Sequence, residues 1–255
     1  MNILTLYNLD IGYKEKTVAE RLNASLKAGA LTCLVGRNGT GKSTLLRTLS
    51  AIQPPLRGRV MLGEKDLSSF SRQQLAKEIT IVKTGRPEIS LMKVYDVVAL
   101  GRTPYTNMWG TMTPEDHAIV SECIARVAIE NLSERAIGSL SDGECQKVMI
   151  AKALAQQTRV ILLDEPTAFL DYPSKVETMM LIKDIIGSTD TRGSKTENIQ
   201  HTAALMSTHD MDLALRLADY LWLMTSDHEL LCGTPEELHS RLSEENLSPK
   251  VGGCK

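Results

Sequence analysis

A glycine-rich segment directly after an apolar run constrains this chain most. The run at 31–35 reads Leu-Thr-Cys-Leu-Val, and helically spaced leucines follow the glycines. A nearly continuous apolar run ending at a glycine is typical of a strand buried in a parallel sheet. The segment between consists of Gly36, Arg37, Asn38, Gly39, Thr40, Gly41, Lys42, Ser43 and Thr44. It matches the pattern G-x-x-x-x-G-K-[ST], so we predict a strand, a phosphate-binding loop and a helix in succession.

The chemistry of a phosphate explains these residue types. Several backbone N–H groups must converge on one anion, and glycines let the chain curl tightly enough. The positive end of the following helix adds to the attraction. Lys42 supplies a full charge at the β/γ oxygens, and Ser43 offers a hydroxyl to Mg²⁺. A glycine turn that only caps a helix is the alternative, but the strand–loop–helix context favours an ATP site.

A pair of carboxylates follows a second apolar run. Residues 160–163 read Val-Ile-Leu-Leu, and Asp164 and Glu165 come next. We predict that Asp164 holds Mg²⁺, directly or through water, and that Glu165 polarises the water that attacks the γ-phosphate. Glu165 would point away from Asp164 if the strand continued. Adjacent acids on a solvated surface are the alternative, which four preceding apolar residues disfavour.

Two further residues gain meaning from this context. His209 follows a short apolar segment at 203–206, and Tyr13 precedes the glycine-rich loop. Taken alone, each is more often a structural residue. Beside a nucleotide site, we predict that His209 contacts the γ-phosphate and that Tyr13 stacks on the purine base.

The rest of the chain alternates between strand and helix patterns. We expect strands at 3–7, 22–26 and 203–206, and a helix that carries Leu45, Leu46, Leu49 and Ile52 and stops at Pro54. The spacing of apolar residues is helical from 87 to 155, and we expect helices at 94–100, 119–128 and 148–154 with an N-terminal cap at 113–116. We expect an exposed loop insertion at 187–201 and a disordered tail at 241–255.

Composition excludes several classes of protein. The net charge is −2, so nothing draws the whole chain to nucleic acid, and we expect no nucleic-acid partner. The five cysteines are scattered, which disfavours a disulfide framework or a zinc site. Residues 1–16 lack the pattern of a signal peptide, and no apolar run approaches the roughly 18 residues that span a bilayer. We therefore expect at most a peripheral relation to a membrane.

Taken together, these motifs resemble the ATP-binding subunit of ATP-binding cassette (ABC) transporters over about residues 3–242. The loop at 36–44 resembles the Walker A motif, and 160–164 resembles Walker B, with Glu165 at the catalytic glutamate. Leu-Ser-Asp-Gly-Glu at 140–144 resembles the LSGGQ signature. Residues 168–171, ending in Asp171, resemble the D-loop. Residues 207–209 resemble the switch histidine, and Tyr13 resembles the adenine-stacking aromatic.

The resemblance implies an α/β fold: a P-loop NTPase (RecA-like) parallel-sheet core with an N-terminal antiparallel β subdomain and an inserted α-helical subdomain. We assign 1–86 and 156–240 to the core lobe and 87–155 to the helical subdomain. The family further implies that two cassettes pair head to tail. Each ATP then lies between one chain's Walker A and the Ser141 hydroxyl and Gly143 N–H of the other. The helical subdomain would dock on an integral membrane permease, at the cytoplasmic face of the plasma or inner membrane.

A narrower resemblance concerns cargo. The stretch 97–105, Val-Val-Ala-Leu-Gly-Arg-Thr-Pro-Tyr, resembles a segment of cassettes that serve iron–siderophore, haem and cobalamin importers. Those importers use an external solute-binding protein as well as a permease. A soluble ABC ATPase, such as one serving cofactor assembly, and a degenerate cassette remain alternatives. A GTPase is disfavoured because no N-K-x-D motif follows the loop.

The chain departs from the family pattern in two places. Thr84 stands where a glutamine that touches Mg²⁺ and the attacking water is expected. It lacks the amide, although it can act through a bridging water. Asp142 and Glu144 replace glycine and glutamine in the signature, which puts added negative charge near a triphosphate. We expect Asp142 to face away from the nucleotide.

Overall fold

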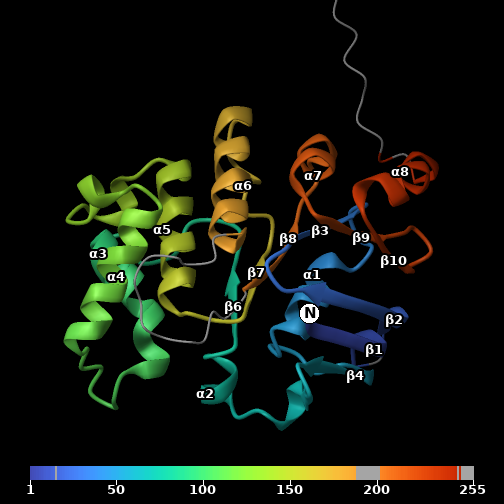
Figure 1. Cartoon of the computed structure of the whole chain (residues 1–255), viewed down its shortest axis with the longest axis horizontal. Coiled ribbons are helices and arrows are strands. Elements are labelled where there is room, and N and C mark those ends of the chain that lie inside the picture. The colour runs from blue at the N-terminus through green and yellow to red at the C-terminus, as the bar shows by residue number, and fades with distance from the viewer. Residues whose placement is uncertain (15, 188–201, 246, 248–255) are drawn as a thin grey trace, which may run out of the picture. The chain divides into compact units, whose positions relative to one another are not determined.

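A computed structural model describes residues 1–14, 16–187, 202–245 and 247 (Figure 1). The chain forms two compact units, one of Met1–Ser69 with Ala203–Lys255 and the other of Phe70–Thr202. The glycine-rich loop and His209 belong to the first unit. Asp164, Glu165 and the segment 140–144 belong to the second.

The first unit contains an antiparallel sheet in the order β2-β1-β4-β5. Its strands are β1 (Asn2–Tyr13), β2 (Lys16–Lys27), β4 (Arg57–Leu62) and β5 (Lys65–Asp66). Leu4 and Leu6 of β1 are buried, and Leu26 of β2 lies opposite Leu4. This one-sided burial is why the alternating pattern predicted strands at 3–7 and 22–26 correctly.

A second set of strands in this unit is centred on β3 (Leu31–Gly36), of which every residue is buried. β8 (Ala203–Ser207) and β9 (Tyr220–Met224) flank β3 in parallel, and β10 (Leu230–Gly233) pairs antiparallel with β9. Leu34 lies opposite Ser207. The carboxyl ends of β3 and β8 therefore meet at one edge, which carries the glycine-rich loop and His209.

The helices of the first unit are η1 (Leu67–Ser69), α1 (Lys42–Leu49), α7 (Met211–Leu217) and α8 (Pro235–Glu244). Two of our boundaries are wrong. α1 ends at Leu49 rather than near Pro54, because Ala51 takes a left-handed backbone with φ of 53°, and Ile52 is exposed. Residues 241–244 are the last turn of α8 rather than tail, because Leu242 is buried there. Residues 246 and 248–255 lie outside the described residues.

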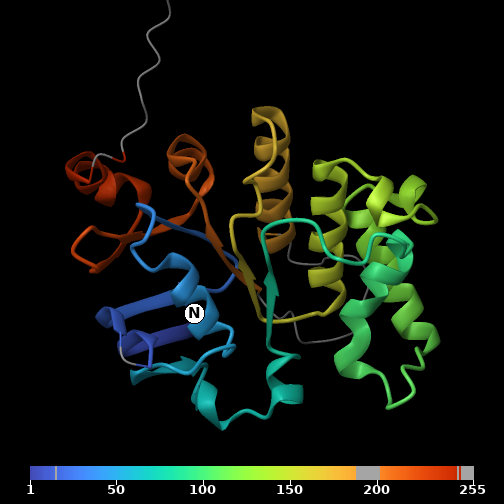
Figure 2. The same cartoon turned by 180° about the vertical axis from the view of Figure 1, so that it is seen from behind.

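The second unit combines two parallel strands with most of the helices (Figures 1 and 2). β6 (Ile79–Val82) pairs with β7 (Val160–Leu163). The helices are α2 (Arg72–Leu75), α3 (Val94–Ala99), η2 (Leu100–Tyr105), α4 (Pro114–Arg126), η3 (Glu130–Leu132), η4 (Ile137–Ser139), α5 (Asp142–Ala155) and α6 (Tyr172–Gly187). Of these, α3, α4 and α5 pack against one another. The proposed helical subdomain at 87–155 lies wholly within this unit. The expected insertion, from 188 on, lies outside the described residues.

The predicted cap at 113–116 is confirmed. Thr113 Oγ1 accepts a hydrogen bond from the N–H of Asp116, and the Asp116 carboxylate accepts from the N–H of Thr113. Such a capping box satisfies two donors that a helix start leaves open. Within the described part of the chain, no helix has the length and apolar character that crossing a bilayer requires.

A buried ion pair ties the helical elements of this unit together. Arg102 Nε donates to Asp116 Oδ1 at 2.8 Å, and both side chains are only 6% exposed. Arg102 Nη1 also donates to the carbonyl oxygen of Ala155, at the end of α5. Gly101 lies against α5 too, since a Cβ there would be 2.4 Å from the Lys152 carbonyl oxygen. The stretch 97–105, whose pattern resembles importers of metal chelates, thus has a packing role.

The Asp116 carboxyl also makes this pair sensitive to acid. The hydrogen bond from the Thr113 backbone, followed by those from Arg102 and the Thr113 hydroxyl, lowers the pKa of Asp116 from 3.8 to about 2. A lowered folded-state pKa contributes stability above the ordinary pKa. That contribution is lost as the pH falls from about 3.8 toward 2.

We expect Arg102→Leu to lower the free energy of unfolding by about 3–5 kcal/mol, because it leaves the Asp116 carboxylate buried without its cation. Urea unfolding followed by circular dichroism measures the change. Arg241→Leu is the control, because it removes an exposed pair with Glu244 and costs at most about 1 kcal/mol. Equal effects of the two variants would show that the buried pair has no special role.

Candidate nucleotide-binding site

The glycine-rich loop curls around the Lys42 ammonium group. Lys42 Nζ donates to the carbonyl oxygens of Gly36 at 2.8 Å and Arg37 at 2.9 Å. Thr40 Oγ1 donates to the same Arg37 carbonyl at 3.0 Å. Lys42 is 6% exposed. A charge this deeply placed needs such partners, and the loop thereby fixes a cation beside its own backbone N–H groups.

Glycine is required at two positions of this loop. Gly41 has φ of 109°, and a Cβ there would lie 2.6 Å from Val18 of β2. A Cβ on Gly36 would lie 2.5 Å from the carbonyl oxygen of Met224 in β9. Neighbouring strands therefore leave no room for a side chain. A Cβ on Gly39 would meet nothing within 4 Å, so space, unlike at Gly36 and Gly41, does not exclude a side chain there.

The helix that follows suits an anion. α1 begins at Lys42 directly after the left-handed Gly41, and its first turn holds no acidic residue. The partial positive charge of the helix start is therefore not cancelled locally. The loop geometry, the lysine and the helix start all fit a phosphate chain.

Tyr13 lies at the end of β1, beside this helix. Its hydroxyl oxygen is 3.4 Å from Thr44 Oγ1 and accepts from Arg47 Nη1 at 3.3 Å. The Thr44 contact, and then the charge of Arg47, lower the pKa of Tyr13 against the effect of burial. The side chain is 49% exposed, so it can stack on a base. Its contact with adenine stays a prediction.

His209 lies at the same edge of the sheet as the loop. The N–H of Thr208 donates to the Leu34 carbonyl at 3.2 Å, which joins the end of β8 to β3. His209 is exposed, and Asp210 after it caps α7 by accepting from the N–H of Leu213. Topology therefore brings His209 and the loop together across a long sequence separation. Its contact with a γ-phosphate stays a prediction.

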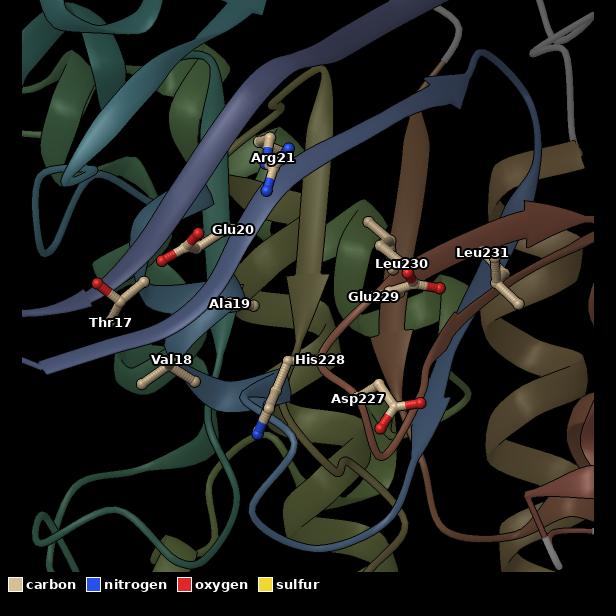
Figure 3. A pocket seen from close by; sticks show the side chains of 10 residues that line it. All are labelled: Thr17, Val18, Ala19, Glu20, Arg21, Asp227, His228, Glu229, Leu230 and Leu231. Carbon is tan, nitrogen blue, oxygen red and sulfur yellow. The ribbon is translucent and has the colours of Figure 1, made fainter.

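Sequence reasoning missed His228, which lies against the loop. Its Nδ1 is 3.2 Å from the carbonyl oxygen of Thr40, and its φ is 63°. It also lines an open groove of about 740 Å³ formed by residues 17–21 of β2, by residues 227–229 of the turn after β9 and by Leu230 and Leu231 of β10 (Figure 3). The residues next to His228 in the sequence do not indicate a site, because its contact with Thr40 joins positions 188 residues apart. Its position depends on the β9–β10 pairing.

In the second unit, Thr84 and Asp164 meet at the ends of β6 and β7. The N–H of Asp164 donates to the Val82 carbonyl at 2.8 Å, and Thr84 Oγ1 donates to the Asp164 carbonyl at 2.5 Å. The Thr84 hydroxyl is thus engaged with the main chain of the predicted metal ligand. A role of Thr84 toward the metal stays a prediction.

Glu165 does not continue the strand. β7 ends at Leu163, and Glu165 takes a left-handed backbone with φ of 48°. Alternation along a strand therefore does not set its direction relative to Asp164. Such a backbone at a non-glycine residue costs about 1–3 kcal/mol and is found preferentially at functional sites.

The segment 140–144 forms the start of α5. Ser141 is the N-cap: its hydroxyl donates to Glu144 Oε2 at 2.9 Å and accepts from the Glu144 N–H at 3.3 Å. The bonds from the Ser141 N–H and then its hydroxyl lower the pKa of Glu144, so Glu144 is ionised at neutral pH. Asp142 pairs with Arg86 at 2.8 Å. Asp171 caps α6, since its carboxylate accepts from the N–H of Ser174 at 3.0 Å.

Comparisons with known proteins identify the class. The family model described as "ABC transporter" matches residues 19–168. An uncharacterized ABC transporter ATP-binding protein of Methanocaldococcus jannaschii is 38% identical over 258 residues, covering 98% of this chain and 85% of that protein. The iron(3+)-hydroxamate import ATP-binding protein FhuC of Bacillus subtilis is 33% identical, covering 93% of this chain and 84% of that protein.

A solved ABC transporter in an inward-facing conformation has the same fold, with a TM-score of 0.81 at 24% identity over 98% of this chain and 90% of that one. The chain belongs to the ABC transporter family. It is an ATP-binding cassette of the transporter ATPases, and the expected P-loop α/β fold is confirmed.

We expect Lys42→Ala to weaken ATP binding roughly ten- to hundredfold, because one charge-assisted hydrogen bond to a phosphate contributes about 1.5–3 kcal/mol. Titration with a fluorescent ATP analogue measures the affinity. The matched control is Lys65→Ala, an exposed lysine on β5 of the same unit. Unchanged ATP affinity in Lys42→Ala would show that the glycine-rich loop does not bind the nucleotide.

Proposed function

We propose that this chain is the ATP-hydrolysing subunit of an importer for a metal chelate, such as an iron–siderophore complex, haem or cobalamin. The observation that carries the cargo class is similarity over nearly the whole chain to cassettes named for such transport. One is the iron(3+)-hydroxamate protein above, and another is the achromobactin transport ATP-binding protein of Dickeya dadantii, 34% identical over 93% of this chain and 84% of that protein.

The proposal assigns a role in ATP binding or hydrolysis to each predicted site residue. The loop N–H groups and Lys42 hold the β- and γ-phosphates, and Tyr13 stacks on the adenine. Glu165 accepts a proton from the attacking water, and His209 donates a hydrogen bond to the γ-phosphate. Each of these roles is part of the proposal.

Mg²⁺ fits the donor set of the chain. The Ser43 hydroxyl and the Asp164 carboxylate are oxygen ligands of the kind that Mg²⁺ prefers. The bound ion would neutralise charge on the phosphate oxygens. Thr84 would act through a bridging water, because its hydroxyl is engaged with the Asp164 carbonyl.

A second copy of the chain completes the site in this proposal. The Ser141 hydroxyl and the Gly143 N–H of one chain reach the γ-phosphate bound by the other. The pair of cassettes docks through the helical subdomain on an integral permease at the cytoplasmic face of the membrane. An external solute-binding protein delivers the cargo to that permease. The alternative is a soluble ABC ATPase, which has no permease.

We expect Glu165→Gln to abolish steady-state ATP hydrolysis while ATP affinity stays within about twofold of wild type, because the amide cannot accept the water's proton. Phosphate release and nucleotide titration measure the two quantities. Glu177→Gln, an exposed acid on α6, is the matched control and should retain activity. Hydrolysis at the wild-type rate in Glu165→Gln would assign the base elsewhere.

We expect the tagged chain, purified from detergent-solubilised membranes of its own cells, to carry an integral membrane protein with it. Mass spectrometry identifies the companion. Reconstituting the pair with its external binding protein and a metal chelate should raise ATP hydrolysis. A chain that hydrolyses ATP but is recovered only from the soluble fraction, without a membrane companion, would favour the soluble alternative.

A further inference from the structure

Arg86 contacts both neighbours of Ser141. It lies in the segment after β6, two residues beyond Thr84, and its side chain reaches the start of α5. Nε donates to Asp142 Oδ1 at 2.8 Å, and Nη2 donates to the carbonyl oxygen of Leu140 at 2.8 Å. One guanidinium thus binds the residues on both sides of Ser141, the serine that contacts the partner's γ-phosphate in the proposed function.

The start of α5 carries an electrostatic conflict. Asp142 and Glu144 occupy its first turn. Carboxylates there stabilise the helix, but they cancel the positive end that would attract a phosphate. The Glu144 carboxylate accepts hydrogen bonds from the Ser141 N–H and hydroxyl, which lower its pKa and favour the anion. The start of α1 has no such acids. A phosphate approaching Ser141 is therefore repelled unless at least one carboxylate is neutralised or directed away.

We propose that Arg86 is a positioning residue for the γ-phosphate contact. Its guanidinium is anchored on the Leu140 carbonyl and neutralises Asp142, so that the Ser141 hydroxyl and the Gly143 N–H can donate hydrogen bonds to the phosphate held by a second copy of the chain. The inference rests on the proposed function. It makes the Arg86–Asp142 pair a replacement for the uncharged residue that the family pattern has at 142.

The geometry favours this role over a simple surface ion pair. The side chains of Arg86 and Asp142 are 47% and 50% exposed, and pairs of that exposure contribute little to stability. The fork shape of arginine allows two directed contacts at once, which a lysine cannot match. Arg86 and Asp142 also line one small cavity with Cys145 and Gln146 of α5, so the pair lies against the first turns of the helix that Ser141 caps.

A double-mutant cycle tests the proposal in the full chain. All variants are made in the Glu165→Gln background, and ATP-dependent dimerisation is followed by light scattering. We expect Arg86→Gln to raise the ATP concentration for half-maximal dimerisation about three- to tenfold, because it leaves Asp142 unneutralised. Asp142→Asn should stay within about twofold of the parent. The double variant should match Asp142→Asn, since no charge then remains to neutralise.

Steady-state kinetics with Glu165 intact gives the second readout. Arg86→Gln should raise the KM for ATP by a similar factor while kcat stays within about twofold. Lys93→Gln is the matched control, because Lys93 forms an exposed 2.8 Å pair with Glu134 in the same unit. It should shift neither quantity. Thermal melts of all variants should agree within a few degrees.

The outcomes separate this inference from the proposed function. An Arg86→Gln shift that is equally large with and without the Asp142→Asn substitution, or no shift at all, would overturn the role of Arg86. A Glu165→Gln parent that does not dimerise with ATP, together with a wild-type chain that does not hydrolyse ATP, would overturn the proposed pairing of cassettes and this inference with it. Loss of folding in Arg86→Gln, rescued by Asp142→Asn, would mark the pair as structural and also overturn the inference.

Discussion

The rest of the first unit depends on the junction between β3 and α1, where a buried ammonium group lies inside a loop of backbone. Lys42 is held by the carbonyls of Gly36 and Arg37. Neighbouring strands leave no room for a side chain on two glycines of the loop, because a Cβ on Gly41 would lie 2.6 Å from Val18 and one on Gly36 would lie 2.5 Å from the Met224 carbonyl oxygen. A charge buried this way is stable only while its partners stay in place. The strands around the loop are therefore as necessary to phosphate binding as the loop itself.

The two helix starts implicated in nucleotide binding are built in opposite ways. α1 begins without acids, and its lysine adds positive charge. α5 begins with two carboxylates and a serine whose hydroxyl is already bonded to one of them. In the proposed contact with a phosphate, Ser141 releases Glu144 while Arg86 holds Asp142. In the proposed pairing, a contact at the second start therefore requires rearrangement of the Ser141–Glu144 hydrogen bond.

The stretch 97–105 shows how one segment can carry two meanings. As a pattern it resembles importers of metal chelates. In the structure, Gly101 lies against the backbone of α5, and Arg102 joins η2, α4 and α5 through a buried pair with Asp116. Packing thus accounts for the glycine and the arginine without reference to cargo. The cargo class rests instead on the similarity of the whole chain to named relatives.

Features that depend on neighbours along the chain could be predicted from the amino-acid sequence. The strand–loop–helix at 31–49, the capping box at Thr113 and the signature at 140–144 are local patterns, because each is set by residues within a few positions of one another. The local elements that carry these residues could therefore be predicted, and the roles of the residues toward a nucleotide stay predictions. Alternation predicted strands 3–7 and 22–26 for the same reason.

Partners that lie far apart along the chain became known from the folded structure alone. Arg86 and Asp142 are separated by 56 residues, and His228 and Thr40 by 188. The hydroxyl of Thr84 is committed to the Asp164 carbonyl, and α1 ends at a left-handed Ala51 rather than at Pro54. No periodicity encodes these contacts, because they arise when separate elements pack and their polar groups must find partners.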